Sequence, residues 1–66
     1  MSNLEITIAV DAMGGEGSPL KVLKGVEIFS NKNPGVEIIL FGNEAKINSC
    51  INKKNLKIQN FKIFAT

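Results

Sequence analysis

The chain has 66 residues, of which 44% are hydrophobic, and it carries eight lysines, no arginine, no histidine and a net charge of +2. This length allows one small domain that buries only about 60% of its unfolded surface, and the ordinary hydrophobic content argues against a disordered chain. The weak positive charge without arginine excludes a nucleic-acid-binding protein, and the lack of histidine excludes metal sites and acid–base catalysis that use imidazole.

The first element is predicted from residues 5–12, EITIAVDA, which are β-branched, apolar and nearly continuous. Such a run is typical of a strand that is covered on both faces. Three glycines follow within GGEGSP, and then Ser18 is predicted to cap a helix whose first residue is Pro19. The strand, turn and helix start therefore follow one another without a linker.

The predicted helix continues through LKVLKGVEIFSNK, where Val22, Val26 and Phe29 fall on one stripe with Leu23 beside it. Gly25 weakens this helix by up to about 1 kcal/mol relative to alanine and is expected to allow a close approach to the sheet. The sequence NPG at 33–35 ends the helix.

A second buried strand is predicted at 36–42, VEIILFG, and Asn43 is expected to cap a second helix over residues 44–54. The apolar side of that helix consists of Ala45, Ile47, Cys50 and Ile51. A third strand is predicted around 61–66, with 56–59 as a short approach to it. No internal repeat or low-complexity segment interrupts this β-α-β-α-β order.

Strands that alternate with helices predict an α/β fold with a parallel sheet and right-handed crossovers. Ligands bind beyond the carboxyl ends of such strands, where the turns 12–18 and 42–44 fall, whereas Lys53, Lys54 and Lys57 are expected at the opposite edge. Two helices cannot cover both faces of three buried strands. We therefore expect residues 1–66 to be the N-terminal fragment of a larger single α/β enzyme, without an internal domain boundary.

The glycine-rich turn is a candidate anion site because free backbone N–H groups and the positive end of a helix dipole meet there. A Walker A loop is excluded because no Gly-Lys-Ser/Thr is present, and a dinucleotide fingerprint fails because Leu20 stands where the third glycine is required. Two interpretations of the turn are then left open with equal weight. It is either a general cradle for phosphate or an oxyanion, or a tight turn with a purely structural role. Asp11 repels a phosphate at close range, so it is expected to hold the turn's N–H groups or to accept a hydrogen bond from a ligand.

The string IAVDAMGGEGSP, followed by a helix with Gly25 and by IILFGN, resembles the N-terminus of the PlsX family of bacterial phosphate acyltransferases. Asp11, Ala12, Met13, Gly14 and Gly15 match the family pattern, and so do Pro19, Gly25 and Gly42. Glu16 stands where the family usually has aspartate, and this longer side chain keeps the charge but moves the carboxylate by one methylene group. The resemblance runs along nearly the whole chain but covers only the opening fraction of a family member.

The resemblance implies a three-layer α/β/α, Rossmann-like fold related to phosphotransacetylase, and a homodimer. It also implies an enzyme that converts acyl-(acyl carrier protein) and orthophosphate into acyl phosphate for phosphatidic acid synthesis. Such a site must hold an anionic nucleophile and stabilise an oxyanion, and a glycine turn at a helix start suits either task. No catalytic residue and no cofactor are assigned, and the isolated chain is expected to be inactive.

The predicted substrate-binding residues are Asp11, Met13, Gly14, Gly15 and Glu16. No metal site is expected, because Asp11 and Glu16 alone make a poor cation site. Cys50 is interpreted as a small packed residue rather than a nucleophile. The lysines, including Lys21 and Lys46 near the ligand edge, are interpreted as solvated.

Two other function classes compete with the acyltransferase. One is a noncatalytic binding or assembly fragment with a phosphate-binding glycine turn, and the other, which the failed fingerprints disfavour, is a nucleotide-binding module. A single cysteine, the absence of a long apolar run and the non-basic start MSNLEIT predict a cytoplasmic protein. Peripheral association with the inner membrane face is the alternative location.

Overall fold

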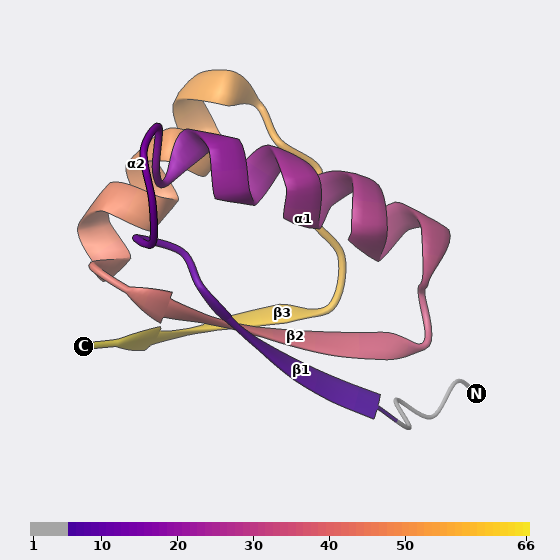
Figure 1. Cartoon of the computed structure of the whole chain (residues 1–66). Helices are drawn as coiled ribbons and strands as arrows, with labels where there is room; N and C mark the ends of the chain where they lie inside the picture. The colour runs from indigo at the N-terminus through magenta and orange to yellow at the C-terminus, as the bar shows by residue number, and fades with distance from the viewer. Residues whose placement is uncertain (1–5) are drawn as a thin grey trace.

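The computed structural model describes residues 6–66, and in this range strands and helices alternate in the predicted β-α-β-α-β order (Figure 1). The elements are β1 (Ile6–Asp11), α1 (Leu20–Lys32), β2 (Val36–Gly42), α2 (Glu44–Lys54) and β3 (Phe61–Ala65). The predicted beginning of the first strand at Glu5 lies outside the described residues. The structure thus confirms the α/β class and the predicted course of the elements.

The three strands form a parallel sheet in the order β1-β2-β3. Asp11 at the end of β1 is opposite Phe41, and Gly42 at the end of β2 is opposite Ala65. Both crossovers run in the same direction along the sheet, so α1 and α2 lie on one face of it (Figure 1). The loops that follow β1 and β2 therefore meet at one edge, as predicted.

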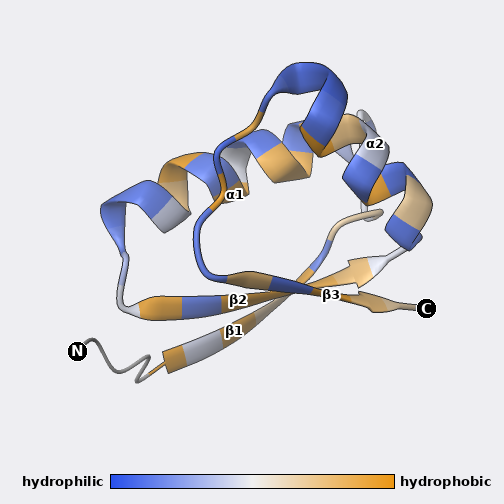
Figure 2. Ribbon diagram, turned by 180° about the vertical axis from the view of Figure 1, so that it is seen from behind, coloured by the Kyte–Doolittle hydropathy of each residue, from blue (hydrophilic) through white to orange (hydrophobic). Residues whose placement is uncertain are grey.

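The core lies between this face of the sheet and the two helices. Alternate strand residues point toward the helices, and hydrophobic positions alternate with hydrophilic ones along both helices (Figure 2). The buried hydrophobic side chains are Ala12, Leu23, Val26, Ile38, Leu40 and Ile47. They join both helices to the second strand and to the residue after β1, which fixes the position of the glycine turn.

Two predictions about α1 are wrong. Phe29 is 37% exposed, whereas Ser30 next to it is 1% exposed. The Ser30 hydroxyl accepts a hydrogen bond from the Gln59 N–H at 3.1 Å, so this side of the helix faces the approach to β3 rather than an apolar surface. Gly25 is exposed with open space around it, so it does not allow a close approach to the sheet.

The second face of the sheet carries a mixed set of side chains. At one end Glu37 accepts a hydrogen bond from Thr7 and pairs with Lys62 at 3.3 Å. At the other end the rings of Phe41 and Phe64 meet edge to face, with centroids 5.8 Å apart. Within residues 6–66 the helices cover only the opposite face, in line with the expectation that two helices cannot cover both faces of three strands.

Candidate phosphate-binding turn

Asp11 ends β1 and anchors the glycine-rich turn. Its carboxylate Oδ1 accepts a hydrogen bond from the Met13 N–H at 3.0 Å, and its carbonyl accepts one from the Gly14 N–H at 3.4 Å. A Cβ added at Gly14 would lie 3.2 Å from Asp11 Oδ2, which is tighter than an ordinary contact. The carboxylate therefore holds the backbone of the turn, which is one of the two roles predicted for it.

The middle of the turn requires glycine for its backbone conformation. Gly15 has a φ of +86° and Gly17 a φ of +80°, both in the left-handed region that L-residues with a side chain avoid. The N–H groups of residues 15–18 have no acceptor among the described residues. A row of free amides in a turn before a helix is the arrangement that binds anions in proteins.

The start of α1 differs from the prediction that Ser18 is its N-cap. Pro19 takes the N-cap position, without a side-chain hydrogen bond to the helix. The Ser18 hydroxyl instead donates to the Gly14 carbonyl, and the Lys21 N–H donates to the Gly17 carbonyl at 2.9 Å. Because Ser18 closes the turn on itself, it leaves the helix N–H groups free of a side-chain oxygen.

Met13 connects the turn to the end of the neighbouring strand. A Cβ added at Gly42 would lie 2.6 Å from Met13 Cγ and 3.4 Å from Ile47 Cδ1, so the thioether packs over Gly42. The Ala12 N–H extends the strand pairing by donating to the Phe41 carbonyl at 2.9 Å. The structure therefore brings the turn 12–18 and the loop after β2 together at one edge, with Met13 between them.

The remaining candidate is Glu16, which is exposed at the tip of the turn, as are Gly14 and Gly15. Among residues 6–66 no group of three histidine, cysteine or acidic side chains is placed to hold a metal ion. Neither helix in this range is long and apolar enough to cross a membrane.

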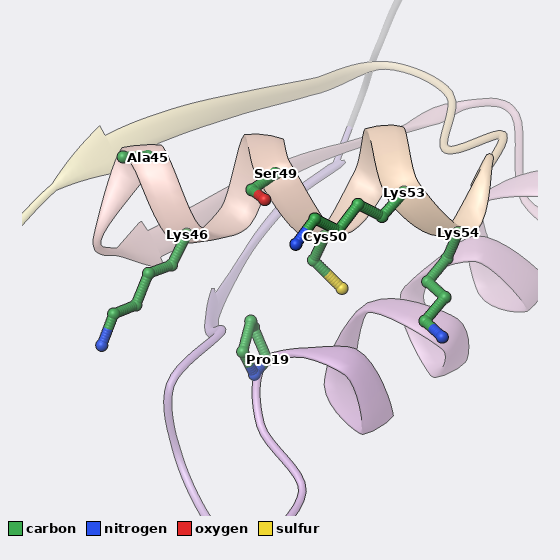
Figure 3. A pocket seen from close by; sticks show the side chains of 7 residues that line it. All are labelled: Pro19, Ala45, Lys46, Ser49, Cys50, Lys53 and Lys54. Carbon is green, nitrogen blue, oxygen red and sulfur yellow. The ribbon is translucent and has the colours of Figure 1, made fainter.

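A groove between the two helices lies beside the turn, and the sequence pattern did not predict it (Figure 3). Its volume is about 420 Å³, and it is lined by Pro19, Ala45, Lys46, Ser49, Cys50, Lys53 and Lys54. Lys53 and Lys54 are predicted far from the ligand edge, but they share this lining with Pro19, the residue that follows the turn. The helical spacing of Lys46, Cys50 and Lys53 could have indicated that these residues share one face of α2. That this face borders Pro19 depends on how α1 and α2 are placed on the sheet.

Comparison with known proteins matches residues 6–66 to the model of a family described as fatty acid synthesis protein. A phosphate acyltransferase of Ligilactobacillus salivarius is 48% identical over 52 residues, which cover 77% of this chain and 16% of the relative. A phosphate acyltransferase of Roseobacter denitrificans is 45% identical over 49 residues, 74% of this chain and 14% of the relative. A third, from the Aster yellows witches'-broom phytoplasma, is 44% identical over 48 residues, 73% of this chain and 13% of the relative.

The three relatives each match about three quarters of this chain. The chain in turn spans between 13% and 16% of the length of these relatives. The family match extends over the whole described range and agrees with the resemblance seen in the turn sequence. The chain therefore belongs to the fatty acid synthesis protein family, and the three relatives that it resembles are named phosphate acyltransferase.

Proposed function

We propose that this chain supplies the phosphate-binding edge of a phosphate acyltransferase in phospholipid synthesis. The observation that carries the proposal is the row of free N–H groups at residues 15–18, directly before α1 and held by Asp11. Two glycines with positive φ let these amides face one anion without side chains in the way. The names of the relatives give the acyl-transfer chemistry in which such an anion takes part.

In the proposed reaction an oxygen of orthophosphate attacks the thioester carbonyl of acyl-(acyl carrier protein). The carbon–sulfur bond breaks, the acyl group joins the phosphate, and the phosphate proton goes to the departing thiolate. The turn would hold the phosphate by its N–H groups and by the positive end of the α1 dipole. Holding the nucleophile beside the thioester lowers the entropic part of the barrier.

Four of the five predicted site residues have a role in this proposal. Gly14 and Gly15 keep the approach to the backbone open, and Asp11 orients the turn through the Met13 N–H. Met13 packs on Gly42 and holds the turn against the second strand. Glu16 is exposed at the tip of the turn and has the same sign of charge as phosphate, so it weakens phosphate binding rather than forming the site.

Phosphate titration of the amide NMR spectrum tests the phosphate role. We expect the amides of residues 15–18 to shift with phosphate and not with chloride at equal ionic strength. Gly15→Ala should weaken phosphate binding about tenfold, because the left-handed backbone costs an alanine about 1–2 kcal/mol. Gly35→Ala is the matched control, since Gly35 has open space and no positive φ. Absence of phosphate-dependent shifts in residues 15–18 would refute the cradle.

A chimera tests the catalytic role and separates it from a noncatalytic phosphate-binding fragment. Residues 6–66 replace the matching segment of the Ligilactobacillus salivarius relative, and acyl phosphate is trapped with hydroxylamine as the hydroxamate. We expect phosphate-dependent hydroxamate formation that falls with Gly15→Ala. A folded chimera that binds phosphate but forms no hydroxamate would favour the noncatalytic alternative. The homodimer and the cytoplasmic or inner-membrane location remain predictions.

A further inference from the structure

The groove beside the turn, which we call the lysine groove, combines positive charge with an apolar floor (Figure 3). Of its seven lining residues, all within the described part of the chain, three are lysines and none is acidic. Lys46, Lys53 and Lys54 are exposed, and Cys50 on the floor is half-buried. The groove therefore attracts negative charge and also offers apolar surface to whatever lies in it.

The lysines are placed by the helical repeat of α2. Lys46 and Lys53 are seven residues apart, so they lie on one face of the helix about 10 Å apart along its axis. Lys54 borders the same groove, and in Figure 3 the side chains of Lys46 and Lys54 lie on either side of Pro19, that of Lys54 extending toward α1. A partner that meets these charges must itself carry negative groups about two helical turns apart.

The open shape of the groove favours a helix over a small molecule as its occupant. Its apolar lining residues are Pro19, Ala45 and Cys50, with the Cys50 thiol pointing toward the Pro19 ring, and it lies open to solvent between α2 and the start of α1. Sites for small molecules enclose most of the ligand surface, which an open groove does not do. A helix can lie in such a groove, with one apolar face on the floor and its other faces in water.

We propose that the lysine groove docks an acidic amphipathic helix of a partner protein. One apolar side chain of that helix lies on the floor near Cys50, and carboxylates two turns apart face Lys46 and Lys53. Pro19 directly follows the glycine turn, so the docked protein sits next to the phosphate cradle. That the partner is the protein that carries the acyl group rests on the proposed function, whereas docking of an acidic helix does not.

A synthetic helical peptide tests the docking by itself. The peptide carries a leucine between glutamates at positions i and i+7, and the control peptide has glutamine at both positions. Cys50 is the single cysteine of the chain, so the rate at which its thiol is alkylated reports whether the groove is occupied. We expect the glutamate peptide to slow alkylation and shift the amides of α2, and the effect to weaken as salt is added.

Charge-reversal variants provide the matched control. The groove variant carries Lys46→Glu, Lys53→Glu and Lys54→Glu. The control variant carries glutamate in place of Lys24, Lys32 and Lys57, which are exposed outside the groove and give the same net charge. All six side chains are exposed, so both variants are expected to fold. Peptide affinity should fall at least about tenfold in the groove variant and less than about threefold in the control.

Three results would overturn the proposal. Equal affinity for the glutamate and glutamine peptides would show that the charge of the peptide plays no part in binding. An equal loss of peptide affinity in the two lysine variants would show that binding depends on the net charge of the chain and not on the groove. Protection of Cys50 by oleate or by anionic phospholipid vesicles, but not by the peptide, would show that the groove binds a lipid and not a protein helix. Docking that persists while phosphate leaves residues 15–18 unchanged would instead refute only the proposed function.

Discussion

Replacing Gly42 by alanine probes the contact that joins the glycine turn to the second strand. Gly42 has a φ of +152° and is buried at the end of β2. The added Cβ would lie 2.6 Å from Met13 Cγ, whereas carbon atoms in contact prefer about 3.5–4.0 Å. Met13 would have to retreat by about 1 Å, and the backbone would have to hold a conformation unfavourable for alanine.

The expected loss of stability combines these two effects. A sparsely populated φ costs about 1–3 kcal/mol, and a displaced Met13 side chain costs about 0.5–1.5 kcal/mol. Together they predict a decrease of about 1.5–4.5 kcal/mol in the free energy of unfolding. A domain of this length has a total of about 3–10 kcal/mol, so Gly42→Ala removes a large fraction of it and lowers Tm by at least about 6 °C.

Thermal unfolding followed by circular dichroism measures the effect, and Gly25→Ala serves as the comparison. Gly25 is an exposed residue within α1, and an added methyl group would meet no atom there, so alanine should stabilise by about 0.5–1 kcal/mol. The same chemical change thus has opposite signs at the two positions. Equal effects of the two substitutions would refute the geometric argument.

Met13→Ala separates the steric part from the backbone part. It removes the Cγ and Sδ atoms that the new methyl group meets, so Gly42→Ala should cost about 1 kcal/mol less in that background. An unchanged cost would show that Met13 does not pack over Gly42 in solution.

Three further substitutions test other parts of the fold by denaturant unfolding. Asn43→Ala should destabilise by about 1 kcal/mol because it removes the side-chain oxygen that caps α2, whereas Asn43→Asp keeps that oxygen and should have little effect. Ser30→Ala should cost about 1–2 kcal/mol because the Gln59 N–H loses its acceptor, and its amide exchange should quicken. Ile47→Ala should cost about 2–5 kcal/mol at a fully buried site, whereas Ile28→Ala, at a residue that is 59% exposed, should cost under about 0.5 kcal/mol; a reversed order would contradict the described core.

Local signals were sufficient to predict the order and nearly all boundaries of the elements. The β-branched runs predicted the strands, and the Asn43 side chain caps α2 as expected. Gly15 and Gly17 have a positive φ, a conformation that glycine adopts at low cost because it has no Cβ. These features depend on neighbours in the chain, so the sequence contains the information directly.

The tertiary structure alone decided which residues of each element meet. The apolar stripe of α1 predicted Phe29 in the core, but the packed helix is turned so that Ser30 faces inward and binds the approach to β3. Periodicity defines a stripe only to within about one residue, because each step turns the helix by about 100°. The polar partner that compensates for burying Ser30 comes from a segment 29 residues away.

The candidate site, like the fold, has parts that the sequence determined and parts that only the tertiary structure decided. The sequence alone determined the glycine turn, its acidic anchor Asp11 and the helix that follows, because these are consecutive in the chain. Only the tertiary structure placed Met13 over Gly42 and brought Lys53 and Lys54 into one groove with Pro19, since these positions depend on how α1 and α2 cross the sheet. Helix packing is set by many side chains at once, and no short motif records it.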